Sequence, residues 1–315
     1  MVVVGTWNLE NLFRPGADFG PTDQSAYQAK LAALAAVIDR LGPDVLAVQE
    51  VGDPQALAEL AQRLTGSWHT VTATVFEQPH AIRVGFLSQL ALSDVTQVAA
   101  FPAELAPVQV DDAGTQITAM PRGALSASVT ADRRKIRLIA CHLKSKLLSF
   151  PGGRFQPHNE GERARFGAYA LDRRAAEAVT VRAAADEMLA GQGTDRAVIV
   201  LGDLNDEPLA ATTQILLGPP GSEIGTPGFQ RPDQGDPARL WNLAPLIPEQ
   251  RRYSRVFHGR PELIDHVLVS HALATRVQSV DTGDFQPPSI GEVPTARRDE
   301  RPSDHAPVIA RFNLN

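Results

Sequence analysis

The sequence predicts an α+β fold in which a core of two β-sheets is covered by helices on its outer faces. Short apolar stretches alternate with helical stretches, but without the regular strand–helix–strand repeat of a doubly wound sheet. No Pro-, Gly- or Ser-rich linker divides the 315 residues, so we expect a single domain over residues 1–315. Two sheets packed face to face fit this pattern best.

The first half of the chain predicts four strands and two helices. The strands are expected at residues 2–8, 44–51, 71–76 and 84–87, the helices at residues 25–41 and 54–64, and an irregular connection at residues 102–121. The first helix is the clearest, because Leu31, Leu34 and Ile38 recur at helical spacing and Gly42-Pro43 follows.

The second half predicts more strands around one long helix. Strands are expected at residues 125–129, 136–143, 197–202, 263–269 and 306–312, the helix at residues 162–189, and irregular segments at residues 145–162 and 219–237. The segment at residues 145–162 is long for a structureless connection, and such loops usually serve function.

Charge and composition exclude some classes of protein. The chain has 36 Asp and Glu against 30 Lys and Arg, a net charge of −6, which argues against coating nucleic acid through bulk charge. A local basic cleft remains open, because Lys144 and Lys146, two of only 4 lysines, lie together. One cysteine, Cys141, excludes an internal disulfide or a cysteine metal cage. No signal peptide or apolar run of ~20 residues is visible, so we expect a cytoplasmic protein with no membrane partner.

Six short stretches place polar side chains at the ends of predicted strands. They are TWNLEN (6–11), VQEV (48–51), CHLKSK (141–146), GDLND (202–206), IDH (264–266) and SDHAP (303–307). Each alone is explained by a turn cap or a surface residue, but the six together are harder to dismiss. Buried carboxylates need a partner or a metal, because burial of an unpaired charge is costly.

The oxygen-bearing side chains of these stretches suit a hard divalent cation. They are Asn8, Glu10, Glu50, Asp203, Asn205 and Asp304. Mg²⁺ is the first choice, with Mn²⁺ or Ca²⁺ as alternatives. Zinc fits less well, because the chain has no HExxH motif and no cysteine spacing typical of zinc sites.

Taken in order, WNLEN, VQEV, CHLKS, GDLND, IDHVLVS and SDHAPV resemble the endonuclease/exonuclease/phosphatase superfamily, which has the deoxyribonuclease I-like fold. The resemblance runs from the first strand to residue 312. It implies a four-layer α/β/β/α sandwich of two mainly antiparallel sheets, with an active site for a phosphate ester at one end.

The resemblance also implies the metal ligands and a phosphate-binding histidine. Glu50 matches the main metal ligand, and Glu10 and Asp304 would assist directly or through water. His142 stands where many members place a histidine that binds phosphate or the leaving group.

The remaining catalytic positions follow from the same resemblance. Asp203 and Asn205 match the pair that positions or deprotonates the attacking water. Asp265 and His305 match a dyad in which the carboxylate orients the imidazole, and Asn8 matches the amide that braces the network. Whether Asp203 or His305 takes the proton is left open by the sequence.

The chain departs from the family pattern around His142. Some members pair this histidine with a glutamate from a middle strand, and here Glu77 is a candidate without a secure match. A role for His142 as a protonated acid is therefore open. Lys144, in phase with His142, is predicted to contact phosphate, and Arg83 is a candidate for the same role. Arg154 is predicted to bind substrate from the 147–162 loop, where we expect substrate selection.

Together these features predict a divalent-metal-dependent enzyme that hydrolyses phosphodiester bonds, with a nuclease acting on DNA or RNA as the first choice. The alternative is a phosphomonoesterase or a small-molecule phosphodiesterase acting on an inositol phosphate, a nucleotide or a lipid head group. An inactive phosphate-binding scaffold is a remote third possibility. No feature indicates a protein partner.

Overall fold

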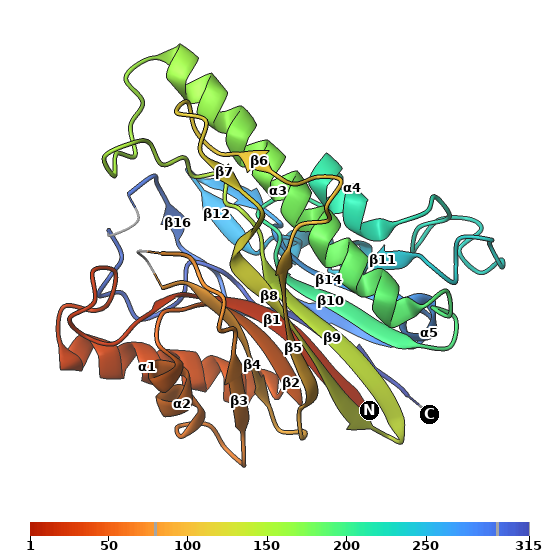
Figure 1. The fold of residues 1–315 in the computed structure, drawn as a ribbon. Helices are drawn as coiled ribbons and strands as arrows, with labels where there is room; N and C mark the ends of the chain where they lie inside the picture. Colours follow the sequence, from red (N-terminus) through yellow and green to blue (C-terminus); the bar gives the residue numbers. More distant parts are fainter. Residues whose placement is uncertain (79–80, 294–295, 315) are drawn as a thin grey trace.

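Two large sheets packed face to face form the centre of the molecule (Figure 1). The structure is a computed structural model that describes residues 1–78, 81–293 and 296–314. Helices cover the outer face of each sheet, so the chain forms the predicted four layers. The expected α/β/β/α sandwich is confirmed.

The first sheet has six strands among the described residues. Their order is β15 (Val277–Asp281), β17 (Val308–Phe312), β1 (Val2–Leu12), β2 (Val45–Val51), β4 (Arg83–Ser88) and β3 (His69–Thr72). Strands β1 and β2 pair in parallel, and the other neighbours pair antiparallel.

The second sheet repeats this plan. Its strand order is β11 (Leu240–Asn242), β14 (Asp265–Ser270), β10 (Ala197–Asp203), β9 (Arg134–His142), β8 (Ala119–Ala131) and β5 (Ser93–Ala100). Again one central pair, β9 and β10, is parallel. Because parallel neighbours end at the same sheet edge, each sheet brings two strand ends together.

The helices are placed by their apolar faces. The outer layers contain α1 (Gln24–Leu41) and α2 (Pro54–Ala61) on the first sheet, and α3 (Glu160–Leu189) and α4 (Ala211–Leu217) on the second, with α5 (His271–Ala274) after β14. Asp23 caps α1 by accepting from the Ala26 amide, and Gly42 ends it with a φ of 60°.

Smaller elements complete the chain. They are the two-stranded ribbon β6 (Val108–Gln109) and β7 (Gln116–Ile117), the small sheet of β12 (Arg255–Phe257), β13 (Arg260–Glu262) and β16 (Ser289–Ile290), and 3₁₀ turns at Ala244–Leu246 and Glu249–Arg251.

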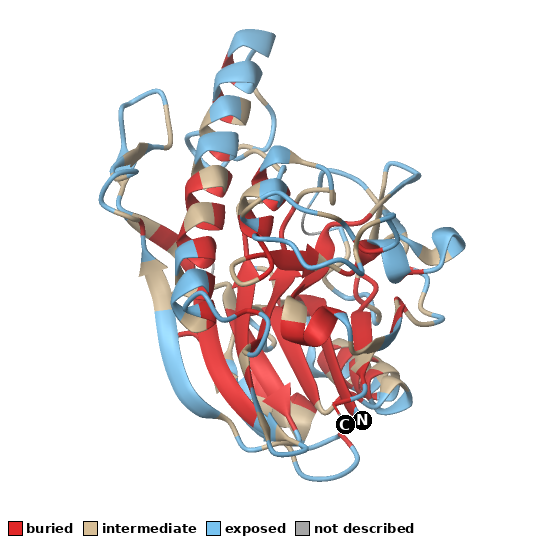
Figure 2. Cartoon of the chain, turned by 90° about the vertical axis from the view of Figure 1, so that its right-hand side faces the viewer, coloured by how far each residue is buried: buried red, intermediate tan, exposed pale blue. Residues whose placement is uncertain are grey.

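Buried side chains gather in three apolar layers, one between the sheets and one under the helices on each side. Figure 2 shows the buried strands at the centre and the exposed faces of the helices outside. In the part of the chain that the structure describes, no helix is both long and apolar enough to cross a membrane.

Most predicted elements are present, two predictions are corrected, and some elements were not predicted. The strand expected at residues 71–76 ends at Thr72, because the chain leaves the sheet there. The connection expected at residues 102–121 holds the β6–β7 ribbon and the start of β8. Helix α4 was not expected at all, since its short ATTQILL segment carries no strong periodicity.

Gly202 permits the parallel pairing that leads to Asp203. Its φ is +151°, and a Cβ at this position would meet the Cys141 carbonyl oxygen at 1.9 Å. Gly202→Ala should therefore lower the free energy of unfolding by about 2–3 kcal/mol, as measured by urea denaturation. In helix α3, a Cβ on Gly167 would meet nothing within 4 Å, so Gly167→Ala should be neutral or stabilising. Equal effects of the two substitutions would contradict this account.

Candidate functional site

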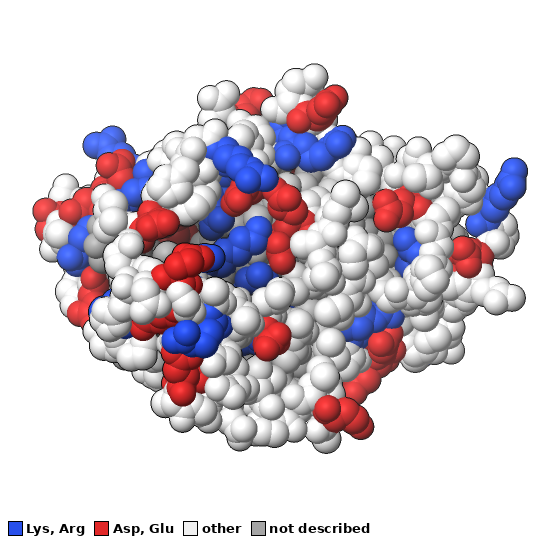
Figure 3. Space-filling model, turned by 90° about the horizontal axis from the view of Figure 1, so that it is seen from above, with Lys and Arg blue, Asp and Glu red and all other residues white. Residues whose placement is uncertain are grey.

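The ends of the two parallel strand pairs meet at one end of the sandwich. Asn8 and Glu50 lie on β1 and β2, while His142 and Asp203 are the last residues of β9 and β10. Figure 3, a view onto this end, shows a hollow with Lys and Arg side chains inside and carboxylates around it. The fold therefore gathers four of the predicted site residues.

The Asn8 side chain joins the two sheets. Its Nδ2 donates to Glu50 Oε1 at 3.2 Å and to Asp203 Oδ2 at 3.1 Å. The Asn8 Oδ1 accepts from the Glu10 amide at 3.0 Å. This single buried amide therefore sets the spacing between the acidic group of one sheet and that of the other, as expected for a bracing residue.

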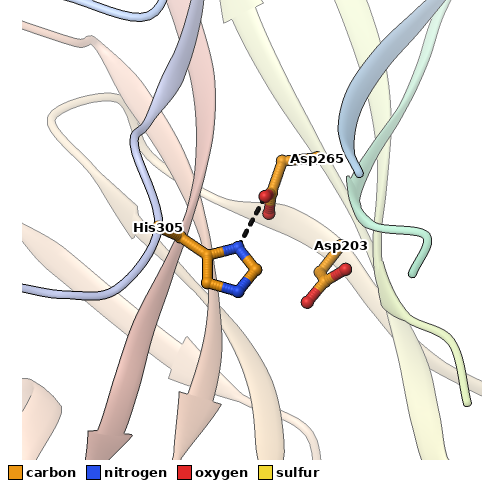
Figure 4. A group of neighbouring side chains, drawn as sticks. All are labelled: Asp203, Asp265 and His305. Atoms are coloured by element: carbon orange, nitrogen blue, oxygen red, sulfur yellow. Dashed lines mark hydrogen bonds and ion pairs between the residues drawn. The ribbon is translucent and has the colours of Figure 1, made fainter. Parts of the chain in front are cut away.

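Asp203, Asp265 and His305 form a compact buried group (Figure 4). His305 Nδ1 lies 2.6 Å from Asp265 Oδ2, and one polar atom of each residue lies within 4.8 Å of the others. The side chains of the expected Asp265–His305 dyad are therefore within hydrogen-bonding distance of each other. Asn205 joins the group through its backbone, because its main-chain N–H donates to Asp203 Oδ1 at 2.9 Å.

Buried hydrogen bonds hold His305 in place. Ser303 Oγ donates to the Asn8 carbonyl at 2.6 Å and accepts from the His305 amide at 3.0 Å. Trp7 Nε1 donates to the His305 carbonyl at 2.7 Å. Sequence reasoning missed Ser303 and Trp7 as supports, although both lie within the stretches it singled out.

Burial and neighbouring charges shift the protonation of this group. Burial, followed by repulsion from Asp265, raises the pKa of Asp203 to about 7. Burial lowers the pKa of His305, but Asp265 and Asp304 outweigh it and raise the pKa to about 10. Without a further cation, the imidazole is therefore charged at neutral pH, and Asp203 titrates near neutrality.

The second acidic group is formed by Glu10, Glu50 and Asp304. Burial, then the charge of Asp304, raises the pKa of Glu10 to about 7. Arg297 opposes this, donating to the two carboxylate oxygens of Glu10 at 2.8 and 3.2 Å. Glu50 Oε2 accepts from the Asn11 amide at 2.9 Å. No sequence pattern indicated Arg297, which lies far along the chain.

The backbone is irregular where these carboxylates are placed. Glu10, Asn11 and Glu50 all have positive φ values, of 48°, 54° and 59°. The register between β1 and β2 shifts at this point. The simple alternation that would put Asn8 and Glu10 on one face is therefore interrupted, and the bulge re-aims the side chains that follow Asn8.

Lys30 is a buried cation beside this acidic group. It lies on α1 and is 2% exposed. Burial lowers its pKa, while the charges of Glu10 and Asp304 act in the opposite direction. A signal for Lys30 existed in the sequence, because it stands beside Leu31 on the apolar face of the predicted helix.

His142 is held by an arginine rather than by a glutamate. Arg122 Nη1 lies 2.7 Å from His142 Nε2. Because arginine can only donate, Nε2 accepts and the proton of a neutral ring lies on Nδ1. Burial, then Arg122, lowers the pKa of His142 well below its ordinary value. His142 therefore stays neutral at physiological pH.

Glu77 reaches His142 only through Arg122. Its carboxylate accepts from Arg122 Nε at 2.8 Å and lies 2.9 Å from Arg173 Nη2. Sequence reasoning missed Arg122 because it lies beside the segment expected to be irregular. Its place opposite β9 follows from the β8–β9 pairing, which a single sequence does not show.

Three predicted substrate-binding residues lie farther out. Lys144 Nζ donates to the Leu147 carbonyl at 2.9 Å. Arg83 donates to the Gly52 carbonyl at 2.5 Å and lines a separate cavity of 740 Å³. Arg154 donates to the Gln156 carbonyl at 2.7 Å and to Glu162 Oε1 of helix α3 at 2.9 Å. Their substrate-binding roles stay predictions.

The acidic residues fit a hard cation on their own chemistry. Glu10 has a raised pKa, and Asp304 is one cause of it. Closely placed carboxylates that resist ionisation are the groups that a bound divalent cation stabilises. The Asp203–Asp265–His305 group fits a cation less well, because an imidazolium already supplies its positive charge.

The sandwich fold and this end-face site define a hydrolase of phosphate esters. The profile of the Endonuclease/Exonuclease/phosphatase family matches residues 5–305, and the chain belongs to this family. The protein is a phosphoester hydrolase of this type, and the family generally depends on a divalent metal. No curated protein sequence matches the chain.

Solved structures share the fold at low sequence identity. A 3′–5′ exonuclease from Neisseria meningitidis is 20% identical with a TM-score of 0.57, over 99% of this chain and 100% of the other. A mannosyl-6-phosphatase from Bacteroides thetaiotaomicron is 13% identical with a TM-score of 0.58, over 99% and 100%. An AP endonuclease from Archaeoglobus fulgidus is 14% identical with a TM-score of 0.56, over the same shares.

The Asp265–His305 pair makes stability depend on pH. A histidine whose pKa is higher in the folded state stabilises the fold fully below its unfolded pKa, and this stabilisation is lost as pH rises through the folded pKa. For His305 the window runs from 6.5 to about 10. In chelator, the free energy of unfolding should fall across this window by a few kcal/mol, measured by urea denaturation. Asp265→Asn should flatten the profile, and an equally steep variant would contradict the assignment.

Proposed function

We propose that the protein is a nuclease that hydrolyses phosphodiester bonds in DNA or RNA with Mg²⁺ bound at its acidic group. The observation that carries the proposal is the Asn8 bridge, which places the acidic group of one sheet beside Asp203 of the other. The basic hollow seen in Figure 3 supports a polyanionic substrate despite the net charge of −6.

In this proposal Asp203 activates the attacking water, and His305 stabilises negative charge on the phosphate. Asp203, with a pKa of about 7, accepts the proton from water as the oxygen attacks phosphorus. Asn8 and the Asn205 amide orient the carboxylate so that one oxygen faces the water. His305, held by Asp265, supplies positive charge to a non-bridging phosphate oxygen.

His142 and Arg122 lie beside Asp203, with His142 Nε2 3.5 Å from Asp203 Oδ2, and in this proposal they stabilise negative charge on the leaving oxygen. The neutral imidazole of His142 is a hydrogen-bond donor through Nδ1, which has no partner among the described residues. Arg122, paired to Nε2, keeps a permanent positive charge behind the ring. Charge that develops on the leaving oxygen is therefore stabilised by a polarised donor and not by a titrating acid.

Glu10, Glu50 and Asp304 would hold the metal ion. A bound Mg²⁺ supplies positive charge to the phosphate oxygens as a Lewis acid. The oxygens of these three residues are hard ligands of the kind that Mg²⁺ prefers, and Mn²⁺ or Ca²⁺ suit the same set.

Relatives of the fold support a nucleic-acid substrate and also keep an alternative open. One similar structure is a 3′ phosphatase from Neisseria bound to a product DNA hairpin, at 20% identity. A sugar phosphatase shares the same fold at 13% identity. A phosphomonoesterase or a small-molecule phosphodiesterase is therefore the second candidate.

A substrate panel in defined metal decides between these candidates. With Mg²⁺, we expect turnover of plasmid DNA, single-stranded DNA or RNA, and slower turnover of a generic phosphomonoester. EDTA should abolish the activity and Mg²⁺ or Mn²⁺ should restore it. Full activity in chelator would contradict the metal assignment, and preferential turnover of the monoester would favour the second candidate.

Substitutions test the proposed water-activating group. Asp203→Ala and His305→Ala should each reduce kcat by at least ~10² while the circular dichroism spectrum stays unchanged. His69→Ala, which removes an exposed imidazole on β3, is the matched control and should retain activity. Rates near wild type in both site variants would place the active site elsewhere.

A further inference from the structure

A second cavity lies beside the site, against helix α3. Its volume is 300 Å³. Its walls come from the β6–β7 ribbon, the 144–151 segment and α3, and its lining residues include Lys144, Ser149, Phe166, Tyr169 and Arg173. The proposed mechanism uses none of these five residues.

The cavity presents an ammonium group without a carboxylate partner. Lys144 Nζ donates to the Leu147 carbonyl at 2.9 Å and to Ser145 Oγ at 3.4 Å, both uncharged. No ion pair of Lys144 is found within the described part of the chain. Burial, then Arg122 and Arg173, lowers the pKa of Lys144 to about 7. Glu77 and Glu177 act in the opposite direction without outweighing these effects. A bound anion would therefore stabilise the charged form of this lysine.

A chain of contacts connects the cavity to the proposed leaving-group side of the site. Arg173 lies 2.9 Å from Glu77, Glu77 accepts from Arg122 at 2.8 Å, and Arg122 lies 2.7 Å from His142. Lys144 also follows His142 by two residues at the end of β9. The cavity is therefore adjacent to the reacting phosphate but separate from it.

Apart from Ser149 and Asp111, the rest of the lining is apolar and aromatic. The Asp111 carboxylate accepts from the Ala113 and Thr115 amides of its own turn. Phe166 and Tyr169 meet edge to face, with ring centroids 5.7 Å apart. Leu148 and Pro151 lie on the facing segment. Aromatic and aliphatic surface beside a cationic end suits a nucleoside that carries a phosphate, since bases and sugars pack on such surfaces.

We propose that this cavity is a nucleotide subsite that binds the substrate phosphate next to the scissile one. Lys144 faces this second phosphate, and the nucleoside packs against Phe166 and Tyr169. Arg173 lines the same cavity but is paired with Glu77 at 2.9 Å and with Glu177 at 2.8 Å. The proposal rests on the proposed nuclease function and extends it. The preferred substrate carries two phosphate groups, one at the metal site and one in this cavity.

Binding of small nucleotides tests the subsite without turnover. Adenosine 3′,5′-bisphosphate should bind the Mg²⁺-loaded wild-type protein at least about tenfold more tightly than adenosine 5′-monophosphate, measured by isothermal titration calorimetry. Lys144→Met should remove this preference, and Lys144→Arg should restore most of it because the charge is kept. Lys146→Met is the matched control, since Lys146 is exposed and paired with Asp206 at 3.2 Å. It should keep the preference.

Kinetics on two diesters complete the test. The Lys144→Met substitution should reduce kcat/KM for a thymidine pentanucleotide about tenfold more than for bis(p-nitrophenyl) phosphate, which has a single phosphate. Equal binding of the two adenosine nucleotides by wild type, or equal losses in the Lys146 control, would overturn the subsite. Wild-type protein that prefers the bisphosphate but does not cleave the pentanucleotide would contradict the nuclease function. It would still support the subsite, as a site for a substrate with two phosphate groups.

Discussion

The geometry of the site depends on one buried amide at the junction of the two sheets. Asn8 donates to a carboxylate on its own sheet, Glu50, and to a carboxylate on the other, Asp203. Its own backbone carbonyl is held by Ser303, which also orients His305. Both acidic groups and the imidazole are therefore positioned relative to a single residue. Loss of its side-chain amide would leave buried Asp203 and partly buried Glu50 facing one another across the sheet interface without a donor between them.

The strand ends and their polar residues were predictable because each depends on a short stretch of neighbouring residues. An apolar run followed by Asp, Asn or His is visible in the sequence, and parallel pairing of β1–β2 and β9–β10 then brings these ends together. The family resemblance supplied the order of the layers, which local patterns do not contain. The assignment of catalytic and metal-binding roles to these residues stays a prediction, although the structure brings most of them together.

The cations of the site were not predictable in the same way. Lys30 and Arg297 reach the acidic group of Glu10 from a helix and a loop, and Arg122 reaches His142 from a strand, all far apart in the chain. Arg122 and Arg297 look like ordinary surface charges when their neighbours in sequence are considered alone, whereas Lys30 stands on the apolar face of its helix. Only tertiary packing shows that Arg297 holds Glu10 and that Arg122 holds His142. The basic residues thus reveal their function only through contacts with distant elements.

The contact between Arg122 and His142 has a consequence for how the enzyme responds to its surroundings. A guanidinium keeps its proton throughout the physiological pH range, so the charge behind His142 is permanent. An enzyme that relies on a protonated histidine at this place loses activity as the medium becomes alkaline. In the proposed mechanism, the described part of this chain offers no such group on the leaving-group side, because His142 is already neutral there. We therefore expect that deprotonation of His142 does not limit activity at alkaline pH. Any loss of activity there would come from the titration of other groups.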